Sequence, residues 1–388
     1  MNMKKKIIFN KPFINHDAKK NILDVLKKNS FTDGLYQRKC EIFIKKRINS
    51  QSIHLTHSCS SALEIAMMLI DLKKDDEVII PSYTFTSTAN CIIMRGAKPV
   101  FADVKLNDLN IDPKEIEKKI NKKTKAIIIV HYAGIACDMN EILRIKKKYD
   151  LFLIEDAAHA FTGKYKNLYL GTIGDFGAFS FHETKNLIAG QGGALSINNK
   201  KFIKSAKFIL DKGTDRSIIK NKKKYYSWKS VGSEYRAPEL TSALLYSQLN
   251  NSKGMQKTRK NIWNYYHENL NALQTNLFYT LNKDTIHKES AYHVFPIIFQ
   301  SKRFRDLFIK YMKAKNVECF FHYYPLHLSS YGKKISKHKL NNTEQVYNGL
   351  VRLPLYPGLK KEELSYIIKQ IIRFDKKYKY LITNRHDM

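Results

Sequence analysis

Metal-binding and disulfide patterns are missing from this sequence of 388 residues. It has no CxxC pair and no close set of cysteine and histidine with the spacing of a zinc site, so neither a zinc module nor a disulfide framework is expected. The few cysteines stand singly along the chain, as Cys40, Cys59, Cys91, Cys137 and Cys319. We therefore expect reduced thiols and no bound metal.

Long apolar runs are also missing. No stretch reaches the roughly 18 apolar residues that a membrane-spanning helix needs. The basic N-terminus, residues 1–6, is followed only by Ile7, Ile8 and Phe9 before the next polar residue, and this run is too short for the apolar part of a secretory signal. We expect a soluble, cytoplasmic protein without a membrane span.

Acidic residues are scarce: 35 Asp and Glu stand against 68 Lys and Arg, a formal net charge of +33. Lysine and arginine neutralise phosphates, so a non-enzymatic binder of nucleic acid or of an anionic surface is one interpretation. The lysines are spread along the whole chain rather than gathered in one stripe, which favours a lysine-rich coding bias on solvated faces. A third interpretation is a basic surface that steers an anionic substrate inward.

Short apolar runs alternate with helical patterns through the first half of the chain. Strands are predicted at 77–81, 99–103, 126–131 and 151–156, and helices at 60–71, 86–95, 113–121 and 140–149. Strand and helix at this spacing indicate a mostly parallel sheet with helices on both faces. Two more strands are predicted at 177–181 and 194–197.

The later part of the chain changes character. A helical pattern runs over 237–270, and a mixed region follows with a strand at 293–299 and helices at 303–313 and 361–374. This change predicts two domains, a large one over residues 1–260 and a smaller C-terminal α/β domain over 261–388.

Asp156 and Lys185 each follow a predicted strand. The carboxyl ends of parallel strands are where open α/β sheets bind ligands. A carboxylate such as Asp156 at that edge suits a pyridinium nitrogen, but it suits the start of a helix equally well. A lysine with a lowered pKa forms an imine with an aldehyde cofactor. Taken alone, Lys185 is one lysine among dozens.

Ser60 and Phe85 add two weaker signals. Hydroxyl residues open the predicted 60–71 helix, and the start of a helix binds phosphate, although Ser60 could simply cap that helix. Phe85 comes soon after the 77–81 strand, where it could stack on a planar cofactor, although an isolated aromatic is more often a core residue. The order of phosphate site, aromatic, strand-end Asp156 and then Lys185 is more specific than any one of them.

Several longer motifs resemble one family, the DegT/DnrJ/EryC1/StrS sugar aminotransferases. They are FNKP (9–12), PSYTFTSTAN (81–90), RGAKPVFADV (95–104), VHYAGIACDM (130–139), EDAAHA (155–160), FSFHETKN (179–186), GQGGAL (190–195), FHYYPLH (321–327) and RLPLYPG (352–358). The resemblance covers nearly the whole chain. It implies the aspartate aminotransferase fold (type I) with pyridoxal 5'-phosphate as cofactor.

The resemblance also implies roles for the residues of the cofactor site. Lys185 would be the imine-forming lysine and proton shuttle, and Asp156 would pair with the pyridine nitrogen. His159 would lie beside the 3-hydroxyl of the cofactor, Phe85 would stack on its ring, and Ser180 would bind its phosphate.

Further positions follow from the same motifs. Cys59 and Ser60 take the place of the phosphate loop, and His322 and His327 match a motif near the sugar. In many members an asparagine reaches the phosphate of the cofactor that is bound in the partner subunit, but this chain has Glu234 at the matching position. Because a carboxylate repels a phosphate, that contact is not carried over.

The implied reaction is transamination from L-glutamate to C4 of dTDP-4-dehydro-6-deoxy-D-glucose, in a homodimer. Lys185 argues against the family branch that has histidine instead and dehydrates its substrate. The motifs PSYTF, HYAG and FHETKN are most similar to transaminases that make dTDP-4-amino-4,6-dideoxy-D-galactose for O-antigen or enterobacterial common antigen. The gluco epimer (viosamine) stays open, because the sequence does not show which face of C4 receives the proton.

Overall fold

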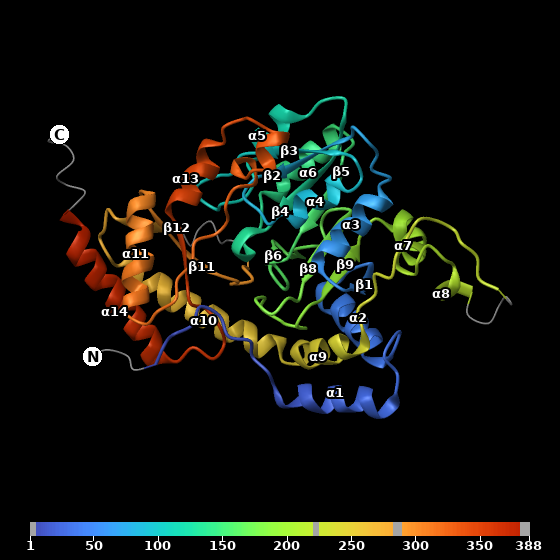
Figure 1. Cartoon of the computed structure of the whole chain (residues 1–388), viewed down its shortest axis with the longest axis horizontal. Coiled ribbons are helices and arrows are strands. Elements are labelled where there is room, and N and C mark those ends of the chain that lie inside the picture. The colour runs from blue at the N-terminus through green and yellow to red at the C-terminus, as the bar shows by residue number, and fades with distance from the viewer. Residues whose placement is uncertain (1–4, 220–224, 282–288, 381–388) are drawn as a thin grey trace.

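The computed structural model describes residues 5–219, 225–281 and 289–380 (Figure 1). Within them the strands form a seven-stranded sheet, a three-stranded sheet and a small two-stranded ribbon. None of the helices in this described part combines the length and the apolarity that crossing a bilayer requires. The same residues contain no group of three or more His, Cys, Asp or Glu that could hold a metal ion.

The large sheet has the strand order β1-β9-β8-β5-β4-β2-β3. Its strands are β1 (Ser52–Thr56), β2 (Glu77–Pro81), β3 (Lys98–Ala102), β4 (Thr124–Val130), β5 (Phe152–Asp156), β8 (Phe176–Ser180) and β9 (Gly193–Ile197). All pairings from β3 to β8 are parallel, and β9 pairs antiparallel with both β8 and β1. The prediction of a mostly parallel sheet is confirmed.

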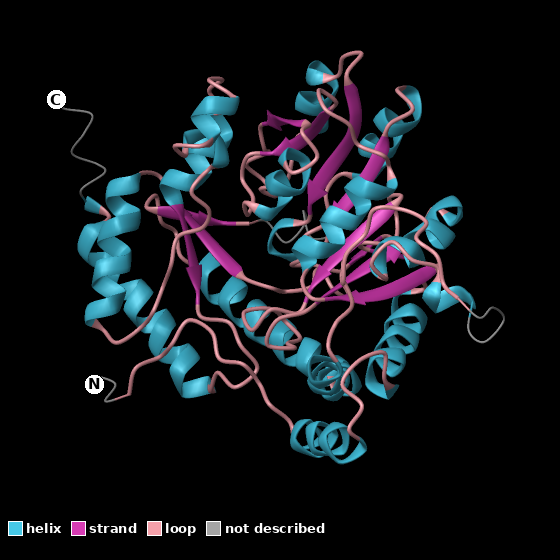
Figure 2. Ribbon diagram, turned by 45° about the vertical axis from the view of Figure 1, so that its right-hand side comes forward, coloured by secondary structure: helices cyan, strands magenta, loops and turns pink. Residues whose placement is uncertain are grey.

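Helices cover both faces of this sheet (Figure 2). Successive residues of β2 show why: Ile80 packs in the core under α3 and α4, whereas Ile79 packs on the opposite face with α5 and α6. A strand that is apolar on both sides must be covered on both sides. The helices of this part are α1 (His16–Lys28), α2 (Leu35–Ile48), α3 (Cys59–Leu69), α4 (Ser87–Ile93), α5 (Pro113–Lys119), α6 (Met139–Lys148), α7 (Ile203–Leu210), α8 (Arg216–Ile219) and α9 (Glu239–Asn250).

The C-terminal part has its own sheet and core. Strands β10 (Phe278–Thr280), β11 (Phe295–Phe299) and β12 (Leu350–Leu353) pair antiparallel, and helices α10 (Ser252–Asn271), α11 (Lys302–Ala314), α12 (Gly332–Ile335), α13 (Asn341–Gly349) and α14 (Lys361–Tyr378) accompany them. Large aromatic side chains such as Trp263, Phe299 and Phe374 fill the core. Each such ring buries a large apolar area, so these aromatic side chains contribute strongly to the stability of this part.

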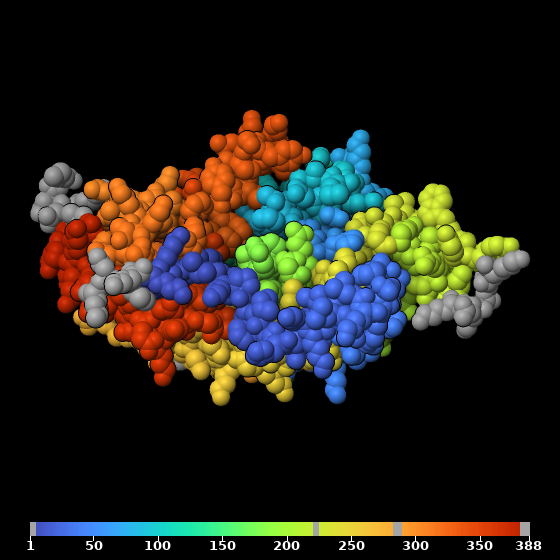
Figure 3. Space-filling model, turned by 60° about the horizontal axis from the view of Figure 1, so that its bottom comes forward, coloured from blue at the N-terminus to red at the C-terminus, as the bar shows by residue number. Residues whose placement is uncertain are grey.

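Two features bear on the predicted division into residues 1–260 and 261–388, which remains a prediction. Helix α10 continues through residue 260 without a break. Ile7 forms a β-bridge with Val317 and belongs to the C-terminal core. Figure 3 shows the N-terminal segment lying against the C-terminal part of the surface.

Glu155, next to the end of β5, fixes the surroundings of that strand end. Its buried carboxylate accepts hydrogen bonds from the backbone N–H groups of Gly171, Ile173 and Gly174, at 2.8, 2.7 and 2.6 Å. It also lies 2.9 Å from Nε2 of the buried His131 at the end of β4. One side chain thus ties the ends of two neighbouring strands to the 171–174 loop.

We predict that Glu155→Ala lowers the free energy of unfolding by about 3–5 kcal/mol, because three N–H groups, two of them buried, lose their acceptor and a buried pair loses one partner. Glu141→Ala, at an exposed carboxylate on α6, is the matched control and should change it by less than about 0.5 kcal/mol. Urea titration followed by circular dichroism measures both. Equal, small effects of the two substitutions would contradict the structural role of Glu155.

Candidate active site

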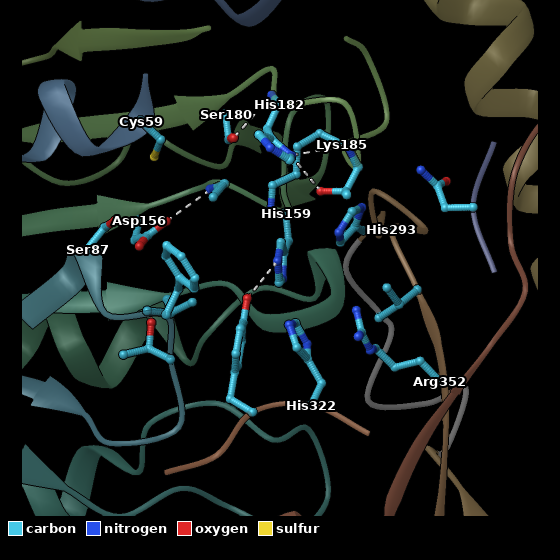
Figure 4. Close-up of a pocket in the computed structure, with 18 of the residues that line it drawn as sticks. Cys59, Ser87, Asp156, His159, Ser180, His182, Lys185, His293, His322 and Arg352 are labelled. Carbon is cyan, nitrogen blue, oxygen red and sulfur yellow. Dashed lines mark hydrogen bonds between the residues drawn. The ribbon is translucent and has the colours of Figure 1, made fainter. Parts of the chain in front are cut away.

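A cavity of about 640 Å³ lies where the carboxyl ends of the parallel strands face the C-terminal part. This volume is typical of a site for a small molecule or cofactor. Eight of the predicted site residues line it: Cys59, Ser60, Phe85, Asp156, His159, Ser180, Lys185 and His322. Figure 4 shows Asp156, at the end of β5, and Lys185, in the turn region after β8, on two sides of this cavity.

The N-terminus of α3 forms one end of the cavity. Ser58 caps this helix by accepting a hydrogen bond from the N–H of Ser61 at 3.1 Å. The interpretation of Ser60 as the cap is therefore wrong, and its hydroxyl instead donates to Oγ of Ser87 at 2.6 Å. A Cβ on Gly193 would lie 2.4 Å from the Cys59 nitrogen, so β9 can approach the helix start only with glycine there. The helix end, with N–H groups lacking intrahelical partners, favours an anion.

Asp156 ends β5 with a buried carboxylate. The Thr88 hydroxyl donates to it at 2.9 Å and the Ala158 N–H at 3.1 Å. Burial raises the pKa of this carboxyl, while these two hydrogen bonds and the nearby Lys185 act in the opposite direction. The chain after Asp156 forms turns and no helix, so the interpretation of Asp156 as a helix cap is wrong.

Lys185 lies in the turn region that follows β8. Burial lowers the pKa of its ammonium to about 8; the carboxylate of Asp156 partly offsets this shift, and Arg352 adds to it. A lysine in this state is partly neutral near physiological pH, so it is able to act both as a nucleophile and as a base.

Three histidines form a group on the side of the cavity near the C-terminal part. The ring centroid of His159 lies 4.3 Å from that of His293 and 5.9 Å from that of His322. Burial lowers the pKa of all three, and the positive charges of Lys185 and Arg352 add to the shift. The imidazoles are therefore neutral near pH 7, and each can donate one hydrogen bond and accept another.

His159 has one further property that bears on a ligand. Its Nε2 lies 3.3 Å from the Tyr323 hydroxyl, but its Nδ1 is buried and has no hydrogen-bond partner among the described residues. An unpartnered buried polar atom is costly unless a ligand or water satisfies it. His159 lines a cavity that is large enough to hold such a ligand.

Phe85 lies at the edge of the cavity with 59% of its surface exposed. The interpretation of Phe85 as a core residue is therefore wrong. Its ring is 6.4 Å from that of Tyr323 and otherwise open, as stacking on a planar ligand requires.

His327 is the one predicted site residue that does not line the cavity. Its Nδ1 lies 2.7 Å from Oγ of Ser82, and its Nε2 lies 3.4 Å from the Glu344 carboxylate. It joins the end of β2 to α13. The predicted role near the sugar remains a prediction, and any such effect would have to act through neighbouring residues.

Among the further residues that line the cavity, four with polar or charged side chains from the C-terminal half had no role predicted from the sequence: Arg259, His293, Tyr323 and Arg352. Arg259 comes from α10, Arg352 from β12, and the other two from loops of the C-terminal part. No local pattern marks His293 or Arg259. Tyr323 and Arg352 belong to the family motifs at 321–327 and 352–358, to which no role was assigned for these two residues. Membership of these motifs was the signal in the sequence that could have identified them.

The chain resembles known proteins over nearly its full length. The model of the DegT/DnrJ/EryC1/StrS aminotransferase family matches residues 12–372. The spore coat polysaccharide biosynthesis protein SpsC of Bacillus subtilis is 30% identical over 371 residues, which are 93% of this chain and 95% of that protein. GDP-perosamine synthase of Escherichia coli O157:H7 is 30% identical over 342 residues, 88% of this chain and 90% of that enzyme.

The fold also matches solved structures. Helicobacter pylori PseC, an aminotransferase involved in the biosynthesis of pseudoaminic acid, superposes with a TM-score of 0.89 at 25% identity. The match covers 96% of this chain and 100% of that one.

The lowered pKa of Lys185 makes a prediction about its reactivity. In protein free of bound small molecules, acylation of Lys185 by trace acetic anhydride should rise with pH through a midpoint near 8, because only the neutral amine reacts and the ammonium dominates below that pH. Exposed lysines should rise only near about 10.4. Mass spectrometry of the labelled peptides measures both. A midpoint near 10 for Lys185 would contradict the lowered pKa.

Proposed function

The chain belongs to the DegT/DnrJ/EryC1/StrS aminotransferase family, and on that basis we propose that it transfers the amino group of L-glutamate to C4 of dTDP-4-dehydro-6-deoxy-D-glucose. As a member it is a sugar aminotransferase that uses pyridoxal phosphate. One observation carries the proposal for the site: the pKa-lowered Lys185 and the buried Asp156 enter the same cavity, whose far end is the start of α3.

The residues present fit this cofactor. The N-terminus of α3 with Ser60, and Ser180 at the end of β8, would hold its phosphate. Asp156 would keep a proton on the ring nitrogen, and the unpartnered Nδ1 of His159 would meet a hydroxyl of the ring. When bound, pyridoxal phosphate supplies a carbonyl carbon that accepts the amino group and a ring that withdraws electrons from the reacting carbon.

Lys185 would move the proton in both halves of the reaction. With a pKa of about 8 its amine is neutral often enough to take a proton from the α-carbon of the amino donor and basic enough to hold it. In the second half the same ammonium would return a proton to C4 of the sugar. Because one group serves both steps, both reacting carbons must occupy the same place beside Lys185.

The neutral histidines would bind the hydroxyl groups of the sugar. His322 stands on the wall formed partly by the C-terminal part, and its Nδ1 lies 3.2 Å from the hydroxyl of the buried Tyr132 behind it. A neutral imidazole binds a hydroxyl without adding charge to a cavity that already contains Lys185 and Arg352. The orientation imposed by this wall decides which face of C4 receives the proton.

We propose the galacto amine, dTDP-4-amino-4,6-dideoxy-D-galactose, as the product, because the motifs 81–85, 131–134 and 181–186 resemble enzymes that form it. The two curated relatives named for spore coat polysaccharide and for GDP-perosamine support a role in surface polysaccharide synthesis. Because the second relative is named for a GDP-linked sugar, the main alternative to the dTDP-linked substrate is its GDP-linked counterpart.

We also propose a homodimer. The segment around α8 projects from the body of the molecule (Figure 1) and exposes large apolar side chains, with Trp228 78%, Tyr225 73% and Val231 67% accessible. Exposed apolar side chains gathered on a projecting segment are typical of a protein–protein contact. Glu234, in the same region, pairs with Lys212 of its own chain, which neutralises its charge.

The first test is an absorbance spectrum. The purified protein with pyridoxal phosphate should show a band near about 410–430 nm, and Lys185→Ala should lose this band together with transamination, because the attachment and proton-transfer group is gone. Lys204→Ala, at an exposed lysine on α7, is the matched control and should keep both. An unchanged band in Lys185→Ala would contradict the assignment.

The second test identifies substrate and product. With L-glutamate, the enzyme should aminate the dTDP-linked 4-keto sugar in preference to its GDP-linked counterpart. Proton NMR of the product should show a small H3–H4 coupling, because nitrogen in the axial position leaves H4 equatorial. A large coupling would establish the gluco epimer, and a preference for the GDP-linked sugar would overturn the dTDP assignment.

A further inference from the structure

Arg352 contributes a positive charge to the active-site cavity, and the proposed reaction assigns no role to this charge so far. It lies on β12, and its guanidinium packs 4.7 Å from the ring centre of Phe9 while one terminal nitrogen donates to the Phe321 carbonyl at 3.2 Å. Its Nε is buried without a hydrogen-bond partner in the described part of the chain. It also makes no ion pair with any described carboxylate.

The charges around the cavity are unbalanced. One lysine and two arginines line it, Lys185, Arg259 and Arg352, against a single carboxylate, Asp156. Arg259 already donates to the backbone carbonyls of Tyr292 and His293. Arg352 is only partly buried, and no carboxylate in the described part of the chain pairs with its guanidinium, so its remaining N–H donors favour an anionic ligand in the cavity.

This cation is separate from the phosphate site at the start of α3. Figure 4 shows Arg352 beside His293 and His322, on the other side of the cavity from Cys59 and Ser180. A cofactor phosphate held by α3 therefore does not satisfy Arg352. The anion that it binds must belong to a substrate.

We propose that Arg352 binds a carboxylate of the amino-acid donor and so selects amino acids as the source of nitrogen. This inference rests on the proposed function. Of the two substrates, the amino acid has a carboxylate bonded directly to the reacting carbon, whereas the nucleotide sugar has its charge on a diphosphate several bonds away. Arg352 and Lys185 line the same cavity, so an anion bound by Arg352 shares this cavity with the reacting carbon.

The chemistry of the side chain fits this ligand. Arginine presents its N–H donors in a planar fork that matches the two oxygens of a carboxylate. The packing on Phe9 and the bond to Phe321 hold the guanidinium in place before a ligand arrives. When the sugar replaces the amino acid, the neutral His322 and His293 nearby offer hydrogen bonds to hydroxyl groups instead.

The test separates the two halves of the reaction in the holoenzyme. L-glutamate is mixed in single turnover with wild type, Arg352→Gln and the control Arg303→Gln, which removes an exposed charge on α11, and the loss of the long-wavelength cofactor band is followed. Arg352→Gln should raise the apparent dissociation constant for glutamate by about 10- to 100-fold, as expected for a charge-assisted hydrogen bond. The control should match wild type.

Two more measurements complete the test. The second half, with amino-loaded enzyme and the nucleotide sugar, should change by less than about threefold in Arg352→Gln. Calorimetric binding of glutarate, a dicarboxylate without an amino group, should weaken by the same factor as glutamate. If Arg352→Gln does not fold, Arg352→Lys decides: it keeps the charge but loses the fork, and should weaken glutamate by about three- to tenfold.

The outcomes are distinct. A loss confined to the nucleotide sugar would assign Arg352 to its diphosphate and overturn the proposal, and equal losses in both halves would assign a merely structural role. Unchanged glutamate binding in Arg352→Lys, where that variant decides, also overturns it. If no nucleotide sugar is aminated, the proposed function fails, but the glutamate half-reaction still tests Arg352.

Discussion

The parallel pairing of β5 with β4 and β8 is the constraint on which the active site depends. In this register Asp156 lies opposite Val130 on one side and Ala178 on the other. The three strands therefore end at one edge, and the segments that follow them meet there. The carboxylate of Glu155 secures this edge, because it binds the loop between β5 and β8 and the imidazole at the end of β4. The positions of Asp156 and Lys185 are consequences of this arrangement.

Electrostatics at this edge follow from desolvation. Burial lowers the pKa of Lys185 and of His159, His293 and His322, and raises that of Asp156. Each shift makes the charged form of the side chain less stable relative to the neutral form. Each of these groups nevertheless lies close to a hydrogen-bonding or charged partner or to the open cavity. A cavity with neutral imidazoles, one titrating lysine and one free guanidinium suits anionic substrates that also carry hydroxyl groups.

Much of the large sheet could be predicted from the sequence, because its strands are short apolar runs with well-marked ends and its helices fit between them. Asp156 and Lys185 could be placed together because parallel strands share an edge. The contribution of the C-terminal part could not be predicted, because Arg259, His293 and Arg352 reach the cavity only through tertiary packing. An apolar cluster that joins Tyr83 and Tyr132, which follow β2 and β4, to Val294 and Ile298 holds this part in place. His327 was predicted near the sugar but does not line the cavity, because its side chain bonds Ser82 instead. A motif near the site therefore does not place every one of its side chains in the cavity.

Lys185, and no other of the many lysines, is the residue that we propose to hold the cofactor. Reduction of the holoenzyme with borohydride makes the bond between lysine and cofactor permanent, and mass spectrometry of a digest then locates it. The reduced cofactor should be found on the peptide that contains Lys185 and on no other. Its presence on a different lysine, or its absence from every peptide of a coloured holoenzyme, would overturn the role of Lys185.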